Sequence, residues 1–139
     1  MLIVFLYITY RDLQTVEIVA IHQRNNYSSI LVRNFPVTNK GKIDWWFKNK
    51  DMLKERYDIP MMASYGSFTV IVWDFGKGYV EEGKYDRLCF DEMKTIANCI
   101  EKNSLARINY SEREGLSFIV DDNGEYKKDK NGKYSRADN

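Results

Sequence analysis

The chain has 139 residues, of which 44% are hydrophobic and 29% are charged. This length suits one domain, since single domains cluster near roughly 100–150 residues. The 21 basic and 20 acidic side chains give a net charge of +1, which provides no long-range field for a polyanion, so nucleic acid is not an expected partner. Two cysteines and one histidine are too few for the four ligands of a structural zinc site.

The chain begins with an apolar run over residues 2–10 that ends at Arg11 and Asp12. Nine helical residues would reach about 14 Å, whereas the core of a bilayer is roughly 30 Å thick. Two interpretations therefore stay open: the end of a longer membrane anchor, or a buried N-terminal β-strand. We expect an apolar anchor over residues 1–12 and a single domain over residues 13–139.

A hairpin is predicted next. Residues 16–23 and 27–33 are rich in β-branched side chains and are separated by Arg24-Asn25-Asn26. Asparagine tolerates positive φ, which a tight reversal between two strands requires.

Residues 40–57 predict an amphipathic helix. Thr38 or Asn39 can cap its N-terminus, and Pro60 lies beyond its end. The helical spacing places five apolar side chains on one face, which we expect to pack on the core: Ile43, Trp46, Phe47, Leu53 and Tyr57.

The C-terminal half predicts several short elements. The continuous apolar run of residues 67–73 indicates a central strand that is buried on both faces. It is followed by a turn at 74–78, a loop or irregular edge strand at 79–86, a short second helix at 90–97, and a hairpin formed by 105–110 and 116–120.

An Asp-x-Asn-Gly-x-Tyr repeat occupies residues 121–126 and 129–134. Asn-Gly is a strong hairpin signal, whereas neither copy completes a calcium loop with a glutamate six residues after its glycine. The repeat therefore predicts strand reversals. The order of the elements favours an α+β fold: an antiparallel sheet of about five to seven strands, packed by one main helix and a short second helix.

Catalytic motifs are lacking. His22 has no nucleophile or carboxylate near it in the sequence, and Gly76-Lys77-Gly78 stands outside any phosphate-binding pattern. Acidic side chains are frequent in the predicted loops, but four acids within thirteen residues are common without catalysis. We therefore expect a binding protein with no enzymatic activity and no cofactor or metal.

Aromatic residues predict a partner-binding surface. With 3 Trp, 10 Tyr and 7 Phe, the chain has more rings than a core of this size readily hides. Trp45 lies off the core-facing stripe and aligns with Met52, although packing of Trp45 against a neighbouring loop is an alternative. The predicted surface combines these two helical residues with residues of the acidic loop: Lys77, Tyr79, Glu81, Glu82, Tyr85 and Asp86.

The two cysteines, Cys89 and Cys99, form either one disulfide or two buried thiols. The choice depends on the redox state of the compartment.

The segments 41–60, 73–79, 82–90 and 98–103 resemble an enterobacterial family of membrane-anchored proteins of unassigned function. The chain is also similar to immunity proteins directed against a secreted bacteriocin of the muramidase type, like pesticin. This resemblance implies an N-terminal inner-membrane anchor, a periplasmic domain, and neutralisation of the bacteriocin by binding. A periplasmic location in turn implies a disulfide between Cys89 and Cys99. The alternative function is an envelope structural or regulatory protein that binds peptidoglycan or another membrane protein.

Overall fold

A computed structural model describes residues 15–137 of the chain. The predicted anchor over residues 1–12 lies outside this range. Within the described range, no helix combines the length and the apolar character needed to cross a bilayer.

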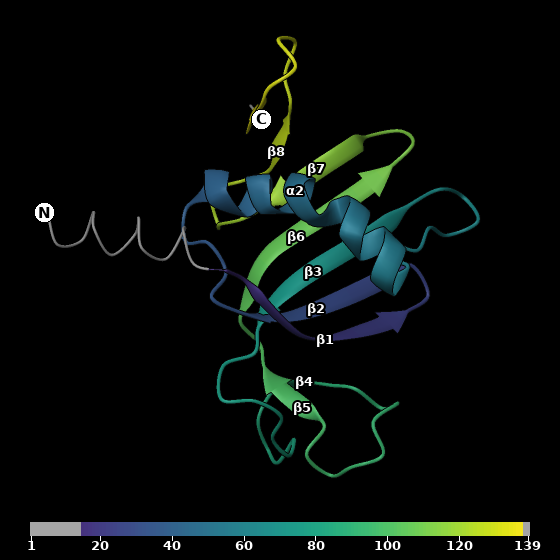
Figure 1. Ribbon diagram of the computed structural model, residues 1–139, viewed down its shortest axis with the longest axis vertical. Coiled ribbons are helices and arrows are strands. Elements are labelled where there is room, and N and C mark those ends of the chain that lie inside the picture. The colour runs from purple at the N-terminus through teal and green to yellow at the C-terminus, as the bar shows by residue number, and fades with distance from the viewer. Residues whose placement is uncertain (1–14, 138–139) are drawn as a thin grey trace, which may run out of the picture.

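One seven-stranded sheet forms the body of the fold, in the order β1-β2-β3-β6-β7-β8-β9 (Figure 1). The strands are β1 (Glu17–Arg24), β2 (Tyr27–Arg33), β3 (Phe68–Asp74), β6 (Ser104–Ser111), β7 (Gly115–Ile119), β8 (Tyr126–Lys128) and β9 (Tyr134–Arg136). The predicted hairpins are confirmed: β1 pairs with β2 and β6 with β7, both antiparallel. Asn25 has a φ of 55° at the first reversal, as its position predicts.

The sheet is antiparallel as expected except at one pair, because β2 and β3 are parallel. The helix α2 (Asn39–Tyr57) lies between these two strands in the sequence and carries the chain back across the sheet. A parallel pair needs such a crossover connection, whereas a tight hairpin can join only antiparallel strands. The fold is therefore α+β with a mixed sheet.

The predicted helix α2 is confirmed, with Thr38 as its N-cap. Thr38 has extended backbone angles (φ −79°, ψ 152°), and its hydroxyl oxygen accepts a hydrogen bond from the Gly41 N–H at 3.0 Å. The helix ends at Asp58, whose left-handed conformation (φ 57°) lets its N–H bond back to the last turn.

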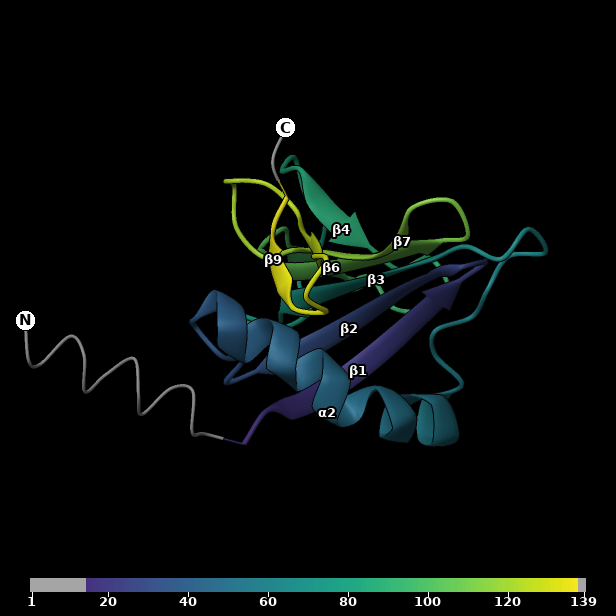
Figure 2. The same cartoon turned by 90° about the horizontal axis from the view of Figure 1, so that it is seen from above.

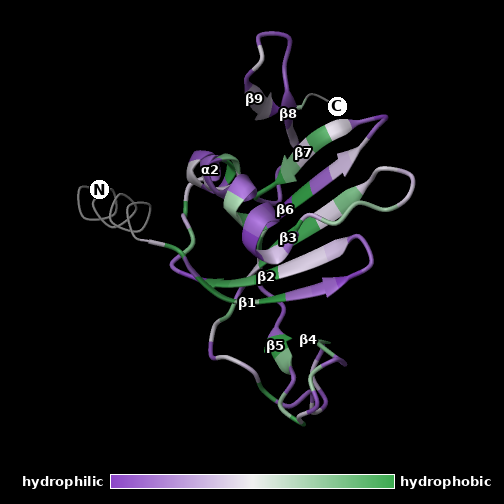
Figure 3. Cartoon of the chain, turned by 45° about the vertical axis from the view of Figure 1, so that its right-hand side comes forward, coloured by the Kyte–Doolittle hydropathy of each residue, from purple (hydrophilic) through white to green (hydrophobic). Residues whose placement is uncertain are grey.

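The main core lies between α2 and the sheet. Ile43, Trp46 and Leu53 of the predicted helical stripe are buried in it, and Figure 3 shows hydrophobic residues on β2 and β3 beneath the helix. Phe47 and Tyr57 of the same stripe keep 39% and 43% of their surface exposed.

The expectation that Trp45 lies off the core is wrong. Only 8% of Trp45 is exposed, and its ring packs edge-on against Phe35 with the ring centroids 5.2 Å apart. Phe35 belongs to the connection between β2 and α2, so the alternative of packing against a neighbouring segment is confirmed. Met52 is partly buried and contacts the same core.

A second, smaller core lies on the opposite face of the sheet. There the short strands β4 (Arg87–Cys89) and β5 (Cys99–Glu101) pair antiparallel, and Figure 2 shows β4 and α2 on opposite sides of the sheet. The buried residues of this core come from β2, from β5 and from the segments after β3 and β4: Leu31, Phe75, Phe90 and Ile100.

The predicted short helix at residues 90–97 is wrong, because this segment consists of turns. The Cα atoms of Cys89 and Cys99 lie 4.0 Å apart, whereas ten helical steps would separate them by about 15 Å. The Phe90 N–H donates to the Asn98 carbonyl at 3.0 Å, which holds the ends of the segment together in a hairpin.

Both Asp-x-Asn-Gly repeats form turns, as predicted. A carboxylate oxygen of Asp121 accepts from the Asn123 N–H at 2.8 Å, and one of Asp129 accepts from the Asn131 N–H at 2.9 Å. An aspartate that bonds to the backbone two residues later stabilises this kind of turn.

Candidate partner-binding site

Residues 75–103 leave the sheet after β3 and form what we call the disulfide lobe. The lobe begins at Phe75, whose N–H donates to the Val32 carbonyl at 2.9 Å. Gly76 and Gly78 follow with φ of 55° and 93°, which glycine adopts at little cost. The predicted turn at residues 74–78 thus directs the chain away from the sheet.

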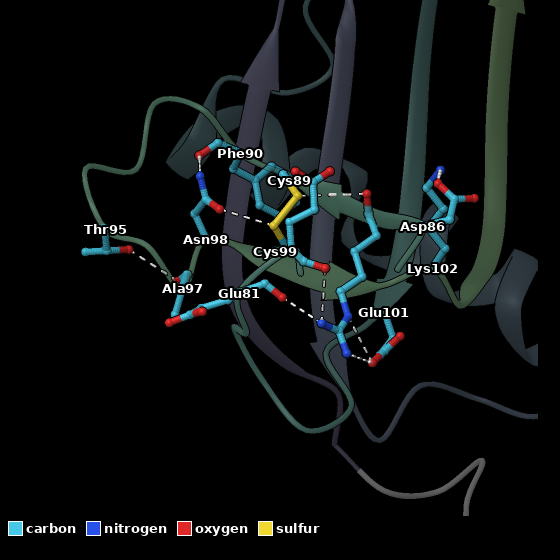
Figure 4. The surroundings of a disulfide bond; sticks show 12 residues. Glu81, Asp86, Cys89, Phe90, Thr95, Ala97, Asn98, Cys99, Glu101 and Lys102 are labelled. Carbon is cyan, nitrogen blue, oxygen red and sulfur yellow. Dashed lines mark hydrogen bonds and ion pairs between the residues drawn. A yellow bond between two sulfur atoms is a disulfide. The ribbon is translucent and has the colours of Figure 1, made fainter. Parts of the chain in front are cut away.

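A disulfide joins the two strands of the lobe, as expected. Cys89 and Cys99 face each other across the β4–β5 pair, with an S–S distance of 2.09 Å (Figure 4). On the other edge of β5, Cys99 pairs with Val80 through two backbone hydrogen bonds of 2.7 and 2.9 Å. The predicted loop at residues 79–86 is therefore fixed to β5 near its start.

Arg87 organises the rest of that loop. Its Nη2 atom lies 3.0 Å from the Glu101 carboxylate, and its Nη1 donates to the Glu81 carbonyl at 2.6 Å. The guanidinium also lies over the ring of Tyr85, 4.7 Å from the centroid. Only 13% of the Arg87 side chain is exposed, whereas its partner Glu101 keeps 45% of its side chain exposed.

Lys77 extends this arrangement through Glu101. Its ammonium nitrogen lies 3.2 Å from the carboxylate oxygen that Arg87 also contacts. Hydrogen bonds from Arg87 and then from Lys77 lower the pKa of Glu101. At the far end of the loop, Asp86 pairs with Lys102 at 2.8 Å.

The lobe is attached to the edge of the sheet through His22 of β1. The Nε2 atom of His22 lies 2.8 Å from the hydroxyl of Tyr79, and its Nδ1 atom lies 2.5 Å from the carboxylate of Glu92. The imidazole also stacks on Phe90 at 3.6 Å, with the rings nearly parallel.

The pKa shifts in this cluster fit a structural role. Burial, and then the charge of Glu92, raise the pKa of Tyr79, so its phenol stays protonated. Burial opposes ionisation of Glu92, but hydrogen bonds from its own backbone N–H and from His22 lower its pKa overall. The sequence did not reveal this cluster, because 57 and 70 residues separate His22 from its two partners.

The structure brings together only part of the predicted surface. The six loop residues lie in the disulfide lobe: Lys77, Tyr79, Glu81, Glu82, Tyr85 and Asp86. Trp45 and Met52 belong to α2, on the other side of the sheet (Figure 2). One continuous contact surface cannot contain both groups.

Within the lobe, Tyr85 is the most accessible ring. It is 60% exposed, whereas Tyr79 is partly buried against Phe75 and Phe90. The carboxylates of Glu81 and Glu82 are exposed and have no ion-pair partner among residues 15–137. Over the same range, no group of three His, Cys, Asp or Glu side chains could hold a metal ion.

The fold and the lobe define a small, mixed-sheet α+β domain stabilised by a disulfide. The chain belongs to the family described as "Enterobacterial putative membrane protein (DUF943)", whose model matches residues 1–138. The expected family is thus confirmed, and its description associates the chain with a membrane. No curated protein and no solved structure matches the chain.

Proposed function

We propose that this protein is a bacteriocin immunity protein, most like the pesticin immunity protein of Yersinia. In this proposal it binds a secreted, peptidoglycan-degrading muramidase in the periplasm and neutralises it without catalysing a reaction. The N-terminal segment anchors it to the inner membrane. The observation that carries the proposal is the disulfide-bonded lobe, which presents the exposed Tyr85 and the carboxylates of Glu81 and Glu82, which have no ion-pair partner among residues 15–137.

Rigidity favours tight binding, because a preorganised loop loses little conformational entropy when a partner docks. The disulfide and Arg87 already fix the backbone that carries Glu81, Glu82 and Tyr85. Tyrosine is frequent among the residues that dominate binding energy in protein interfaces. An inhibitor of a muramidase needs these properties, since steric occlusion of a sugar-binding cleft requires no turnover.

The disulfide supports the same proposal. A disulfide persists in oxidising environments such as the periplasm and is rare in the reducing cytosol. A membrane anchor on the periplasmic side would confine the inhibitor near the incoming toxin and raise its effective concentration.

The test is a protection assay with the full-length chain. Cells that produce it are challenged with a purified muramidase of the pesticin type, and the toxin dose that kills half of them is measured. We expect Tyr85→Ala, and the pair Glu81→Ala with Glu82→Ala, to lower that dose at least tenfold. Tyr57→Ala is the matched control, because Tyr57 is also exposed but lies on α2.

Two results would count against the proposal in different ways. If the unaltered chain gives no protection and does not bind the toxin, the immunity function is wrong. If it protects but the lobe variants protect equally well, only the surface assignment is wrong. Circular dichroism of each purified variant confirms that it is folded.

The second candidate is an envelope structural or regulatory protein that binds peptidoglycan or another membrane protein. The membrane description of the family favours it. Capture of partners from producing cells separates the two candidates, because immunity requires one dominant partner of muramidase type.

A further inference from the structure

The disulfide lobe covers only one end of the sheet face that points away from α2. A row of cross-strand partners runs over the uncovered part of this face, which we call the open face. From β2 to β8 the row is Tyr27, Thr69, Asn109, Ser117 and Lys127. The residues between them along the strands, such as Ile30, Val70, Ile108 and Phe118, point into the core beneath α2.

Two hollows lie along the open face. One, of about 630 Å³, lies between the lobe and the sheet and is lined by Arg24, Tyr27, Ser29, Ile71, Trp73 and Phe90 among others. The second, of about 350 Å³, is lined by Tyr27, Tyr65, Thr69, Asn109 and Ser117 among others. Tyr27 lines both, so the two hollows are neighbours on the open face, and we refer to them together as the groove. Hollows of this size are in the range of ligand sites.

The floor of the groove has unused hydrogen-bonding capacity. The Ser117 residue is 5% exposed, yet its hydroxyl has no hydrogen-bond partner in the described part of the chain. The Thr69 hydroxyl donates to the Asn109 side-chain oxygen at 3.0 Å, which leaves the NH2 of that amide without an acceptor over residues 15–137. Buried polar groups are normally paired, so the Ser117 hydroxyl indicates a ligand that hydrogen-bonds to it. The partly buried Asn109 amide lies across the strand pair from Ser117 and offers two further donors.

Aromatic rings flank these polar groups. Tyr27 and Tyr65 are 50% and 72% exposed, and Trp73 lines the other hollow with its indole N–H 3.3 Å from the Ser29 hydroxyl. The flat, apolar face of such a ring suits the C–H face of a pyranose, while short hydroxyls and amides suit its hydroxyl groups. This combination matches the chemistry of a sugar chain.

Other classes of ligand fit the groove less well. The floor strands β2, β3, β6 and β7 are each paired on both sides, so they offer no free backbone edge to an extended peptide. A polyanion is disfavoured, because four carboxylates line the two hollows, namely Asp91, Glu92, Glu114 and Glu125, against two lysine or arginine side chains, Arg24 and Lys127.

We propose that the groove on the open face binds a neutral oligosaccharide. The rings of Tyr27 and Tyr65 stack on sugar units, and Asn109 and Ser117 hydrogen-bond to sugar hydroxyls. None of the residues proposed to bind the toxin, Glu81, Glu82 and Tyr85, lines either hollow, so either proposal can fail while the other stands.

The test is a titration of the full-length chain in detergent with the N-acetylglucosamine hexamer and, separately, with maltohexaose. Binding is measured by calorimetry, and the site is mapped by NMR shifts of backbone amides. We expect saturable binding of at least one sugar, with the largest shifts in β2, β3, β6 and β7. Tyr27→Ala and Asn109→Ala should each weaken it at least tenfold.

Two matched variants sharpen this test. Tyr27→Phe keeps the ring and should retain most of the affinity, whereas Tyr57→Ala removes a similarly exposed ring from α2 and should change nothing. Failure of both sugars to saturate at millimolar concentration would overturn the proposal. The proposal would also be overturned if Tyr27→Ala bound the sugar with wild-type affinity. The same holds if an unstructured hexapeptide at equal concentration displaced the sugar from the groove.

Discussion

The Nε2 atom of His22 and the phenol oxygen of Tyr79 lie 2.8 Å apart, although 57 residues separate them in the sequence. The other ring nitrogen of His22 contacts Glu92, and the ring itself stacks on Phe90. One side chain on an edge strand therefore connects the sheet to the segments on either side of β4. We infer that the attachment of the disulfide lobe depends in part on this imidazole.

The first prediction tests that dependence with Tyr79→Phe. The substitution keeps the ring but removes the hydroxyl, and it leaves a nitrogen of His22 unpaired where only 12% of the imidazole side chain is exposed. An unsatisfied polar group of this kind should lower the free energy of unfolding by about 1–2 kcal/mol. Urea denaturation measures the change. Tyr85→Phe is the control and should match the wild type, because its exposed hydroxyl makes no hydrogen bond in the described structure.

The second prediction concerns acid stability and Asp121. Hydrogen bonds from Arg136, the Asn123 N–H and Asn39 lower the pKa of Asp121 from its ordinary value of 3.8 to about 2. A lowered carboxyl pKa stabilises the fold fully above the unfolded value. This stabilisation is lost as the pH falls from near 4 through 2. We therefore expect Asp121→Asn to make the fall in unfolding free energy over that range shallower.

Arg136→Gln provides the internal check of the Asp121 prediction. It removes the ion-pair partner, whose Nη2 lies 3.2 Å from the carboxylate, and should also flatten the pH dependence. The double variant should add little to either single one, since both changes remove one interaction. An unchanged pH dependence in Arg136→Gln alone would show that Asp121 owes its low pKa to the other groups, the Asn123 N–H and Asn39.

Most local elements of the fold follow from the sequence, because each depends on residues close together in the chain. The exception is the segment 90–97, where the expected helix is absent and the disulfide holds the ends together. Asn25 marks the first hairpin, Thr38 caps α2, and the Asp-x-Asn-Gly repeats form turns. The parallel pairing of β2 with β3 was missed, although a strand, a helix and a strand occur in succession. The length of α2 allows either pairing, and the sequence does not say on which side of β2 the next strand will lie.

The features that depend on distant residues could not be predicted. The pairing of His22 with Tyr79 and Glu92 has no local pattern, and the open face combines residues from β2, β3, β6 and β7. Trp45 was misplaced because helical periodicity assigns one buried stripe. It cannot show that Phe35, outside the helix, covers a neighbouring side.

The third prediction concerns the disulfide. Replacing Cys89 and Cys99 together by serine opens an 11-residue loop, which the chain-entropy model values at about 2.8 kcal/mol of unfolding free energy. We expect faster hydrogen exchange in β4 and β5, because the disulfide joins these two strands. The turn between them carries Phe90 and Glu92, which contact His22 of the sheet, so these contacts should loosen as well. The amides of β3 should stay protected, because the main core does not contain the lobe. Loss of protection throughout the sheet would show that the lobe and sheet unfold together.

The last prediction separates a core role from a binding role for Trp45. Because 8% of this residue is exposed and its ring packs on Phe35, Trp45→Ala should leave a cavity and cost about 3–5 kcal/mol of unfolding free energy. That loss is a large share of the total stability of a small domain, about 5–15 kcal/mol. In the protection assay, cells that produce Trp45→Ala should therefore be less protected, in proportion to their lower level of folded protein.

Calorimetry with purified, folded Trp45→Ala decides between the two roles. If the ring acts only in the core, the folded fraction binds the toxin with wild-type affinity. Met52→Ala is the comparison on the same helix, and its smaller, partly buried side chain should cost less stability. If Trp45→Ala has wild-type stability but no longer binds the toxin, the tryptophan lies at an interface. In that case Phe35 and α2 would have to move apart when the partner docks.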